Sequence, residues 1–347
     1  MDGMSRRRFL RAAAAGGVAA ATGLGFGPGS ARAAGTQASW GNLTPGFTIL
    51  VTQYMLAKKL DEKNGVQFGT PMNYTSVGTF YQDFVAGRFD VCMGTWDTFA
   101  ARYLAGVPME LVCTITTGEM INIIAPAKGP NNVKELAGKT VAALQSSGTY
   151  RLTKALIKEY NGIDLEAVAT VQNVDNPAAA VTLVMADRAD AGLSWEPNIS
   201  SALRRVPTLK VIYNAGAEYR AKTGLDLPFF GVAIRKELSA REPHVARNIN
   251  RAFADCLAGI MGNVDVAFAD CLAGIMGNVD EAVAIGGAGT GIPADVLKLA
   301  ISSGRLVFKH GSMSDPAARK SVLAAADLLQ RNGLLPKKLD DAFFAAS

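Results

Sequence analysis

Short apolar runs alternate with amphipathic segments along most of the chain, up to about residue 234. Runs rich in β-branched and aromatic side chains predict strands, and apolar residues at helical spacing predict helices. Segment 47–60, for example, places Ile49, Met55, Leu56 and Leu60 at helical spacing. Strands are expected at 37–40, 66–74, 89–93, 109–115, 121–125, 140–144, 167–172, 189–193, 209–213 and 229–234, and helices at 47–60, 79–86, 97–105, 149–160, 178–186 and 198–204, with a helical turn at 133–136.

Strands that alternate with helices of this length are typical of parallel α/β units. They fall into two groups, with boundaries near 118–121 and 226–231, and the chain after residue 234 is expected to be almost wholly helical. If the chain crosses between the groups at both boundaries, the crossovers form a hinge beside a cleft. Ligands bind open α/β sheets at the carboxyl ends of the strands, so both lobes would face that cleft. Lobe 1 is expected to comprise residues 34–118 and 226–347, and lobe 2 residues 119–225.

One segment of the C-terminal region is an exact tandem duplication. Residues 252–265 and 267–280 both read AFADCLAGIMGNVD, so Cys271 copies Cys256. Two copies do not make a repeat array, so the sequence indicates a recent duplication or a sequence error. A shift of 15 residues nearly preserves the apolar face of a helix, whereas the Gly262-Asn263 pair would instead end one helix and start another. We expect a lengthened or protruding helix away from the cleft.

Residues 1–33 have the order of features found in an export signal. A basic segment, SRRRFLR at 5–11, is followed by an Ala- and Gly-rich apolar stretch at 12–26 and by Ala31-Arg32-Ala33. This order predicts cleavage before Ala34, the alternative being a basic surface helix. The paired arginines resemble a twin-arginine signal, which implies export to the periplasm in the folded state.

Composition narrows the class of function. The chain has 347 residues, of which 49% are hydrophobic and 19% charged, as in globular proteins. Residues 1–33 hold five arginines and one acid, which leaves 30 basic and 29 acidic residues, so no nucleic-acid-binding surface is indicated. Two histidines and four cysteines without a C-x-x-C pattern argue against a metal site. No G-x-S-x-G, P-loop or H-E-x-x-H motif is present, and we expect neither enzymatic activity nor a cofactor.

Four predicted strand-to-helix junctions are rich in glycine, serine and threonine. A helix start leaves backbone N–H groups unpaired and carries a partial positive charge, so several starts around one cleft form an anion pocket without lysine. Ordinary helix capping explains any single junction equally simply. The candidate ligand-binding residues at these junctions are Thr44 and Gly46, then Ser76, Gly78 and Thr79, then Thr95, and finally Ser146, Ser147, Gly148 and Thr149.

The three tryptophans, Trp40, Trp96 and Trp195, lie at or near predicted strand ends, where they would be either ligand-contacting or core residues. Glu196 follows Trp195 and precedes a proline. Its carboxylate would accept a hydrogen bond from a ligand amine or hydroxyl, or would instead complement a helix dipole. Arg151 would pair with an anionic ligand or lie on a solvated helix face.

Cys92 and Cys113 lie on two predicted strands that would be neighbours in one sheet. Oxidation is possible outside the cytoplasm, but buried strand cysteines are usually inert. We therefore expect two free thiols.

Four segments together carry a family resemblance. They are FVAGRFDV at 84–91, AGVP at 105–108, VKELAGKTVA at 133–142 and ADAGLSWEP at 189–197. Through them the chain resembles the periplasmic substrate-binding proteins of ABC importers of the nitrate/sulfonate/taurine type, which include thiamine-pyrimidine binders. The resemblance covers the mature chain apart from the duplication.

That resemblance implies a two-lobed, type II periplasmic binding protein fold, with two doubly wound sheets, a two-strand hinge and a helical C-terminal tail. It implies a hinge-closing monomer that delivers a small solute to permease subunits and touches the membrane only through them. The ligand would be held by the junction residues named above together with Trp40, Trp96, Trp195 and Glu196. Arg151 is the one nearby candidate for a sulfonate-clamping arginine, and Glu196 favours a ligand with a donor group, such as an amino-sulfonate.

Three alternatives remain open at this stage. The ligand would be a pyrimidine or thiamine precursor, or an aromatic acid, instead of a sulfonate. The protein would be a solute sensor that docks to a histidine kinase, which sequence cannot separate from a transport receptor. A fungal pyrimidine synthase shares the fold, but the chain matches neither its cysteine-rich iron site nor its active-site histidine.

Overall fold

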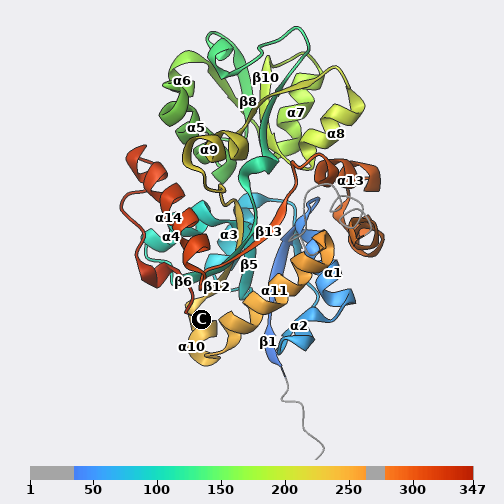
Figure 1. Ribbon diagram of the computed structural model, residues 1–347, viewed down its shortest axis with the longest axis vertical. Helices are drawn as coiled ribbons and strands as arrows, with labels where there is room; N and C mark the ends of the chain where they lie inside the picture. Colours follow the sequence, from blue (N-terminus) through green and yellow to red (C-terminus); the bar gives the residue numbers. More distant parts are fainter. Residues whose placement is uncertain (1–34, 263–277, 347) are drawn as a thin grey trace, which may run out of the picture. The chain divides into compact units, whose positions relative to one another are not determined.

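The computed structural model describes residues 35–262 and 278–346. They form two mixed sheets flanked by helices (Figure 1). We call the half built on the six-stranded sheet lobe 1 and the half built on the five-stranded sheet lobe 2. The predicted export signal and most of the second copy of the duplication lie outside the described residues.

The sheet of lobe 1 has the strand order β13-β6-β12-β5-β2-β4. β2 pairs in parallel with β4 and β5, whereas β12 runs antiparallel to both β5 and β6. The strands are β2 (Trp40–Leu43), β4 (Met72–Tyr74), β5 (Val91–Thr95), β6 (Met109–Thr116), β12 (Phe230–Arg235) and β13 (Phe308–Ser312). β1 (Thr36–Ala38) and β3 (Val66–Phe68) form a separate parallel pair.

The sheet of lobe 2 has the order β11-β7-β10-β8-β9. β8 pairs in parallel with β9 and β10, and β7 runs antiparallel to β10 and β11. The strands are β7 (Ile121–Ala125), β8 (Thr140–Ala143), β9 (Thr170–Asn173), β10 (Ala191–Trp195) and β11 (Lys210–Asn214).

The chain passes between the two sheets twice. It leaves β6 for β7 through the 3-10 turn η1 (Gly118–Met120), and it returns from α9 (Ala215–Thr223) to β12. The two crossover segments lie side by side, because the Gly118 N–H donates to the Leu227 carbonyl at 2.7 Å. Each sheet is mixed, rather than purely parallel as the pattern predicted, because the strands that follow the crossovers run antiparallel to their neighbours.

Helices cover both sheets. In lobe 2 they are η2 (Val133–Leu136), α5 (Gly148–Asn161), α6 (Leu165–Val168), α7 (Pro177–Met185), α8 (Asn198–Arg205) and α9. In lobe 1 they are α1 (Thr48–Ala57), α2 (Leu60–Lys63), α3 (Val77–Val85), α4 (Trp96–Leu104), α10 (Lys236–Arg241), α11 (Val245–Met261), residues 278–286, η3 (Ala288–Thr290), α13 (Ala294–Ser302), α14 (Pro316–Arg331) and η4 (Asp341–Phe343). Two C-terminal helices reach lobe 2, since α13 packs against α8 and α14 against α5 (Figure 1).

Capping residues in the sequence fix several helix ends. The Ser147 hydroxyl accepts a hydrogen bond from the Tyr150 N–H at 3.2 Å and starts α5, and Gly162 ends it with φ +69°, a left-handed conformation that favours glycine. Asn176 caps α7 through the Ala179 N–H at 2.9 Å, with Pro177 at the first helical position. In both cases the capping residue lies only a few positions after the preceding strand, so the helix begins close to the end of that strand.

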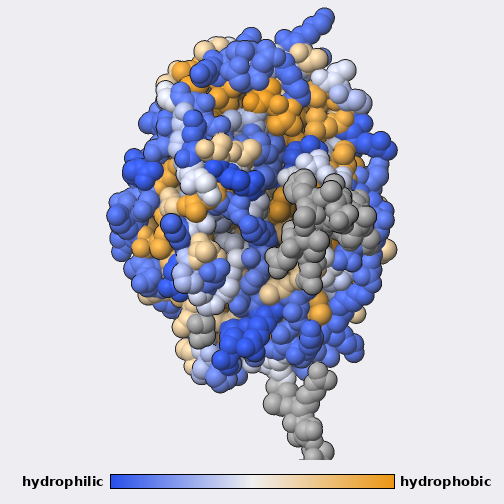
Figure 2. Space-filling view, viewed as in Figure 1, coloured by the Kyte–Doolittle hydropathy of each residue, from blue (hydrophilic) through white to orange (hydrophobic). Residues whose placement is uncertain are grey.

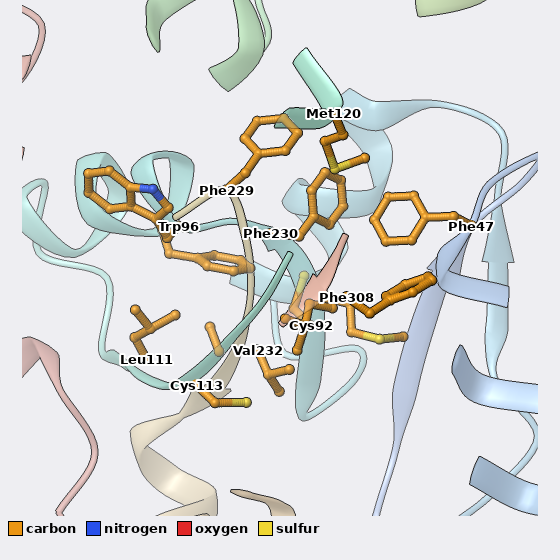
Figure 3. Packing of buried hydrophobic residues seen from close by; sticks show 14 of the residues in the cluster. Phe47, Cys92, Trp96, Leu111, Cys113, Met120, Phe229, Phe230, Val232 and Phe308 are labelled. Carbon is orange, nitrogen blue, oxygen red and sulfur yellow. The ribbon is translucent and has the colours of Figure 1, made fainter. Parts of the chain in front are cut away.

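Aromatic side chains fill the core where the crossovers meet lobe 1. Phe47 packs edge-on against Phe230, with ring centroids 4.9 Å apart, and Phe229 packs edge-on against Phe230 at 5.1 Å. Met120 of η1 and Trp96 of α4 lie in the same cluster (Figure 3). The loop before α1 and the return strand β12 are therefore held in one apolar unit.

The predicted pattern was wrong in three places. The C-terminal region contains strand β13, whose single large apolar residue, Phe308, gives no strand pattern but is buried beside β6. The predicted strand 66–74 is two strands, because β3 pairs with β1 and β4 with β2. Helix α9 was missed because Gly216 weakens its helical pattern, yet a Cβ at that position would lie 2.3 Å from the Glu119 nitrogen, so close packing requires glycine.

Apolar surface gathers in the upper part of Figure 2, the region in which Figure 1 places α7. That helix is apolar along almost its whole length, and Ala178 in its first turn is exposed. Within residues 35–262 and 278–346, no helix combines the length and the apolar character needed to cross a bilayer.

The three cysteines in the described part of the chain are free thiols, as predicted for Cys92 and Cys113. These two lie on β5 and β6, which are separated by β12, and Cys256 lies on α11. Burial raises the pKa of all three thiols, so they are inert. Cys271 lies outside the described residues, as does the expected protruding helix of the duplication.

Candidate ligand-binding site

A cavity of about 320 Å³ lies between the lobes, within the size range of small-molecule sites. Lobe 1 contributes the loop between β2 and α1, the start of α3, and Phe230. Lobe 2 contributes the starts of α7 and α8. The lining residues are Leu43, Thr44, Pro45, Gly46, Phe47, Thr48, Thr75, Val77, Asp175, Asn176, Pro177, Ala178, Trp195, Glu196, Pro197, Asn198, Phe230 and Ile292.

Helix N-termini from both lobes border this cavity. The start of α1 has no side-chain cap, whereas Ser76 caps α3, Asn176 caps α7, and the Glu196 carboxylate accepts the Ser200 N–H in the first turn of α8. The N-terminal N–H groups of a helix need partners and carry a partial positive charge. An acceptor group of a ligand is therefore favoured at the uncapped start of α1, where Thr48 lies.

The hydroxyl of Thr48 points to the same conclusion. Thr48 is 2% exposed and lines the cavity, and its Oγ1 atom has no hydrogen-bond partner among the described residues. An unpaired buried hydroxyl costs free energy unless a ligand or water satisfies it. Phe47, Phe230 and the half-buried Trp195 supply the apolar walls.

Glu196 lines the cavity, but its carboxylate already has partners. Arg305 Nε donates to Oε1 at 2.6 Å, Ser200 Oγ donates to Oε1 at 2.9 Å, and the Ser200 N–H donates to Oε2 at 3.0 Å. Arg305, in the turn after α13, also donates to Ser200 Oγ at 3.0 Å. The carboxylate is thus committed to an ion pair between α8 of lobe 2 and the C-terminal region, rather than left free for a ligand amine as the sequence suggested.

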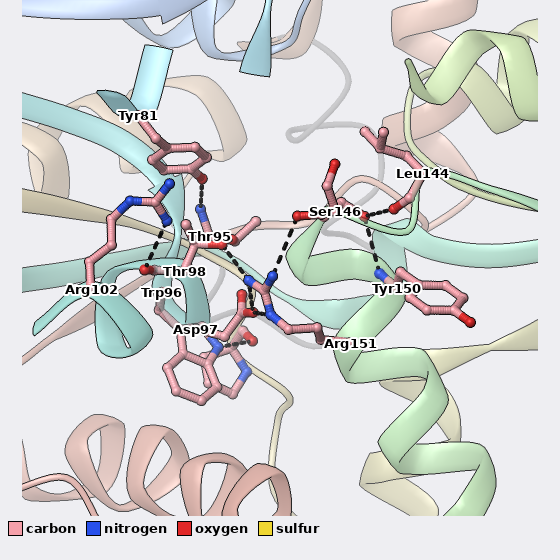
Figure 4. A network of polar contacts seen from close by, with 12 residues as sticks. Tyr81, Thr95, Trp96, Asp97, Thr98, Arg102, Leu144, Ser146, Tyr150 and Arg151 are labelled. Atoms are coloured by element: carbon pink, nitrogen blue, oxygen red, sulfur yellow. Dashed lines mark hydrogen bonds and ion pairs between the residues drawn. The ribbon is translucent and has the colours of Figure 1, made fainter. Parts of the chain in front are cut away.

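Two further predicted junctions meet each other in a second interlobe contact (Figure 4). None of its residues is among those that line the cavity. Arg151 of α5 donates to Asp97 Oδ2 of α4 from Nε at 2.9 Å and from Nη2 at 2.6 Å. Nη2 also donates to Thr98 Oγ1 at 2.6 Å, and Thr98 Oγ1 accepts a further hydrogen bond from Thr95 Oγ1 at 2.8 Å. Asp97 raises the pKa of Arg151, so the guanidinium remains charged despite its partial burial.

A buried tyrosine supports this contact from lobe 1. Tyr81 Oη accepts a hydrogen bond from the Thr95 N–H at 2.8 Å, and burial raises the pKa of Tyr81 to about 12. The guanidinium of Arg102 lies over the Tyr81 ring, 4.6 Å from its centroid. Burial lowers the pKa of Arg102, and the ring face compensates part of the lost hydration.

The remaining predicted site residues do not line the cavity. Trp40 is buried and stacks on Phe68, with centroids 4.1 Å apart and its indole N–H on the Gly69 carbonyl. Trp96 is buried and donates to the Pro228 carbonyl at 2.7 Å. Ser76, Gly78 and Thr79 are exposed at the start of α3, where Ser76 accepts from the Thr79 N–H, and Ser146, Ser147, Gly148 and Thr149 form the start of α5.

Of the predicted residues, the cavity therefore brings together Thr44, Gly46, Trp195 and Glu196. Sequence reasoning missed Thr48 and Phe230. Thr48 follows the glycine-containing junction directly and was within reach of the same argument, whereas Phe230 reaches the cavity only because β12 pairs with β5. In the part of the chain that the structure describes, no cluster of three or more His, Cys, Asp or Glu side chains is arranged to hold a metal ion.

A family model described as the periplasmic substrate-binding protein of a phosphonate ABC transporter matches residues 50–258. A search of curated protein sequences gave no significant match.

Solved structures share the fold. The periplasmic aliphatic sulphonate-binding protein SsuA of Escherichia coli has a TM-score of 0.66 at 16% identity, with 90% of this chain and 92% of that chain covered. The alkanesulfonate-binding protein SsuA of Xanthomonas axonopodis pv. citri, bound to MOPS, has a TM-score of 0.64 at 16% identity, with coverages of 87% and 95%. A Candida albicans protein with the generic periplasmic binding protein fold has a TM-score of 0.61 at 13% identity, with coverages of 89% and 93%. These similarities confirm the predicted two-lobed α/β fold.

Proposed function

This chain belongs to the family of periplasmic substrate-binding proteins of ABC transporters, and from that premise we propose that it captures a small organic anion between its lobes and delivers it to permease subunits. The observation that carries the proposal is the cavity bordered by helix starts from both lobes, α1 and α8, of which α1 has no side-chain cap. A ligand that contacts both lobes stabilises the closed form over the open form, which is how such a receptor signals occupancy.

The anionic group is proposed to lie at the helix starts, with Thr44 and Thr48 as hydroxyl donors. The apolar part of the ligand would contact Phe47, Trp195 and Phe230. The alkanesulfonate-binding proteins of similar fold support a sulfonate as the first choice of head group. The size of the cavity favours a sulfonate with an apolar body over one as small as taurine.

A second candidate is an uncharged aromatic solute such as a pyrimidine. One observation favours it: the described residues that line the cavity include the acids Asp175 and Glu196 but no lysine, arginine or histidine. Because no positively charged side chain lines the cavity, an anion would be bound only through N–H and hydroxyl donors, without a counter-charge. A neutral ring would instead be held by the aromatic walls and by Asn176 and Asn198.

The test uses the mature chain, residues 34–347, in a thermal-shift screen against alkyl and aryl sulfonates, taurine, phosphonates, aromatic acids and pyrimidines. A ligand at a hundred times its dissociation constant stabilises the folded state by about 2.7 kcal/mol, which raises the melting temperature. Thr48→Val is expected to abolish the shift caused by a sulfonate. Thr79→Val is the matched control, because Thr79 is exposed on α3 outside the cavity lining.

A shift with pyrimidines and none with sulfonates would replace the first candidate by the second. No shift with any compound, or an equal loss in both threonine variants, would count against the cavity as the binding site. The export route proposed is the twin-arginine pathway, because of the arginines at 6–8. Replacing Arg6, Arg7 and Arg8 with lysine should leave the precursor in the cytoplasm, as fractionation would show.

A further inference from the structure

The carboxylate of Asp97 lies between two positively polarised groups of the opposite lobe. Asp97 is in the first turn of α4 and is fully buried. Its Oδ2 atom accepts both hydrogen bonds from Arg151, whose side chain is about one-quarter exposed (Figure 4). Hydrogen bonds between an ionised arginine and a carboxylate are stronger than those between neutral groups.

The second oxygen of Asp97 faces the start of α5. A Cβ atom at Gly148 would lie 2.2 Å from Asp97 Oδ1 and 2.6 Å from Thr95 Oγ1, so only glycine allows this approach. Asp97 Oδ1 and Thr149 Oγ1 are both buried and have no hydrogen-bond partner among the described residues. The start of a 14-residue helix thus meets a buried carboxylate oxygen.

We propose that Asp97 supplies, from within the chain, the anion that would otherwise bind between Arg151 and the start of α5, and so determines specificity by closing this position to ligands. The same contact latches lobe 1 to lobe 2. The inference rests on the proposed function only in taking the lobes to open and close.

Two consequences follow for the receptor. A ligand head group is confined to the cavity beside α1 and α8, since Arg151 near the start of α5 already holds a carboxylate. The closed form is also stabilised without ligand, so a ligand has to contribute less differential binding to complete closure. Glu196 and Arg305 add a second buried-carboxylate pair between the same two lobes.

The test is chemical rescue of Asp97→Ala. We expect this variant to shift the ligand-free ratio of closed to open molecules by roughly tenfold or more toward the open form, measured as the radius of gyration by small-angle X-ray scattering. Formate should then bind in the vacated position and return the radius and the melting temperature toward the parent values, with a saturable dose dependence. The parent protein and the double variant Asp97→Ala, Arg151→Ala should not respond to formate.

Asp164→Ala is the matched control, because Asp164 pairs with Lys158 within lobe 2 and is exposed. It should change neither the radius nor the response to formate. If Asp97→Ala keeps the parent radius and ignores formate, the proposal is overturned. If Asp97→Ala does not fold, Asp97→Asn decides, because it keeps the shape without the charge: an increased radius supports the latch, and an unchanged radius contradicts it. None of these readouts involves the solute, so a failed ligand screen would leave them intact.

Discussion

Arg305 and Glu196 are 109 positions apart in the sequence, yet Arg305 Nε lies 2.6 Å from Glu196 Oε1. The glutamate is fully buried and the arginine side chain is 18% exposed. The pair ties the start of α8 in lobe 2 to the turn that follows α13. It therefore connects one wall of the cavity to the C-terminal region.

Glu196→Gln should destabilise the protein. The substitution keeps the shape of the side chain but leaves Arg305 without its counter-charge, which we expect to lower the free energy of unfolding by about 3 kcal/mol. Urea unfolding followed by circular dichroism measures this. Glu281→Gln is the control, since Glu281 is half-exposed and pairs with Lys58 at 2.5 Å, and an exposed pair contributes at most about 1 kcal/mol. Equal losses of stability in the two variants would show that the buried Glu196–Arg305 pair contributes no more than an exposed pair.

Trp96 and Trp195 should separate stability from binding. Trp96 is fully buried, so Trp96→Ala is expected to cost about 3–5 kcal/mol of folding free energy. Trp195 is half-buried in the cavity wall, and Trp195→Ala should cost less stability but abolish the thermal shift caused by the most stabilising compound of the screen. Unfolding curves and thermal shifts on both variants check this. A Trp195→Ala protein that keeps the full shift would place the ligand elsewhere.

Local sequence rules predicted most strands and helices of the fold, because the formation of each element depends mainly on residues close together in the sequence. Ser147 caps α5 and Asn176 caps α7 through hydrogen bonds that span three residues. The same rules placed Thr44 and Gly46 beside a helix start, and both line the cavity. These local rules do not predict which residues a side chain contacts from distant parts of the sequence.

Trp40 and Trp195 illustrate the difference. Both were expected at strand ends, but Trp40 begins β2 and stacks on Phe68 of β3, whereas Trp195 ends β10 at the cavity. Which way each ring points depends on strand pairing, which the sequence pattern does not contain. The partner of Arg151 was missed for the same reason, because Asp97 lies 54 positions away and joins it only through the packing of two lobes.

His310 should make the stability of the protein depend on pH. Burial lowers the pKa of His310 below its ordinary value of 6.5, so the folded state favours the neutral ring. The contribution of this ring to stability is present above about pH 6.5 and is lost as the pH falls, because the unfolded chain then binds a proton that the folded protein does not. His310→Gln should therefore flatten the fall in stability from about pH 7.5 to about pH 5. NMR titration of the parent provides the direct check, and a ring that titrates at or above its ordinary value would contradict the prediction.

Removal of one duplicated unit should leave the fold and the site unchanged. The described residues contain one complete copy in two parts, 252–262 at the end of α11 and 278–280 at the start of the next helix. Phe253 and Cys256 of the first part and Val279 of the second are fully buried, so these two parts, which together make one copy, contribute side chains to the described core. Deleting 263–277 joins Gly262 to Asn278 and gives the same sequence as deleting 266–280.

We expect this deletion variant to keep the melting temperature and the ligand-induced shift of the parent. Deleting 252–280 is the contrasting variant, because it removes Phe253 and Ile260 from the core and should abolish folding. Circular dichroism and the thermal-shift screen measure both. A large loss of stability or binding on removal of 263–277 alone would mean that the second copy contributes to the folded protein, and the duplication would then be a functional addition rather than a neutral one.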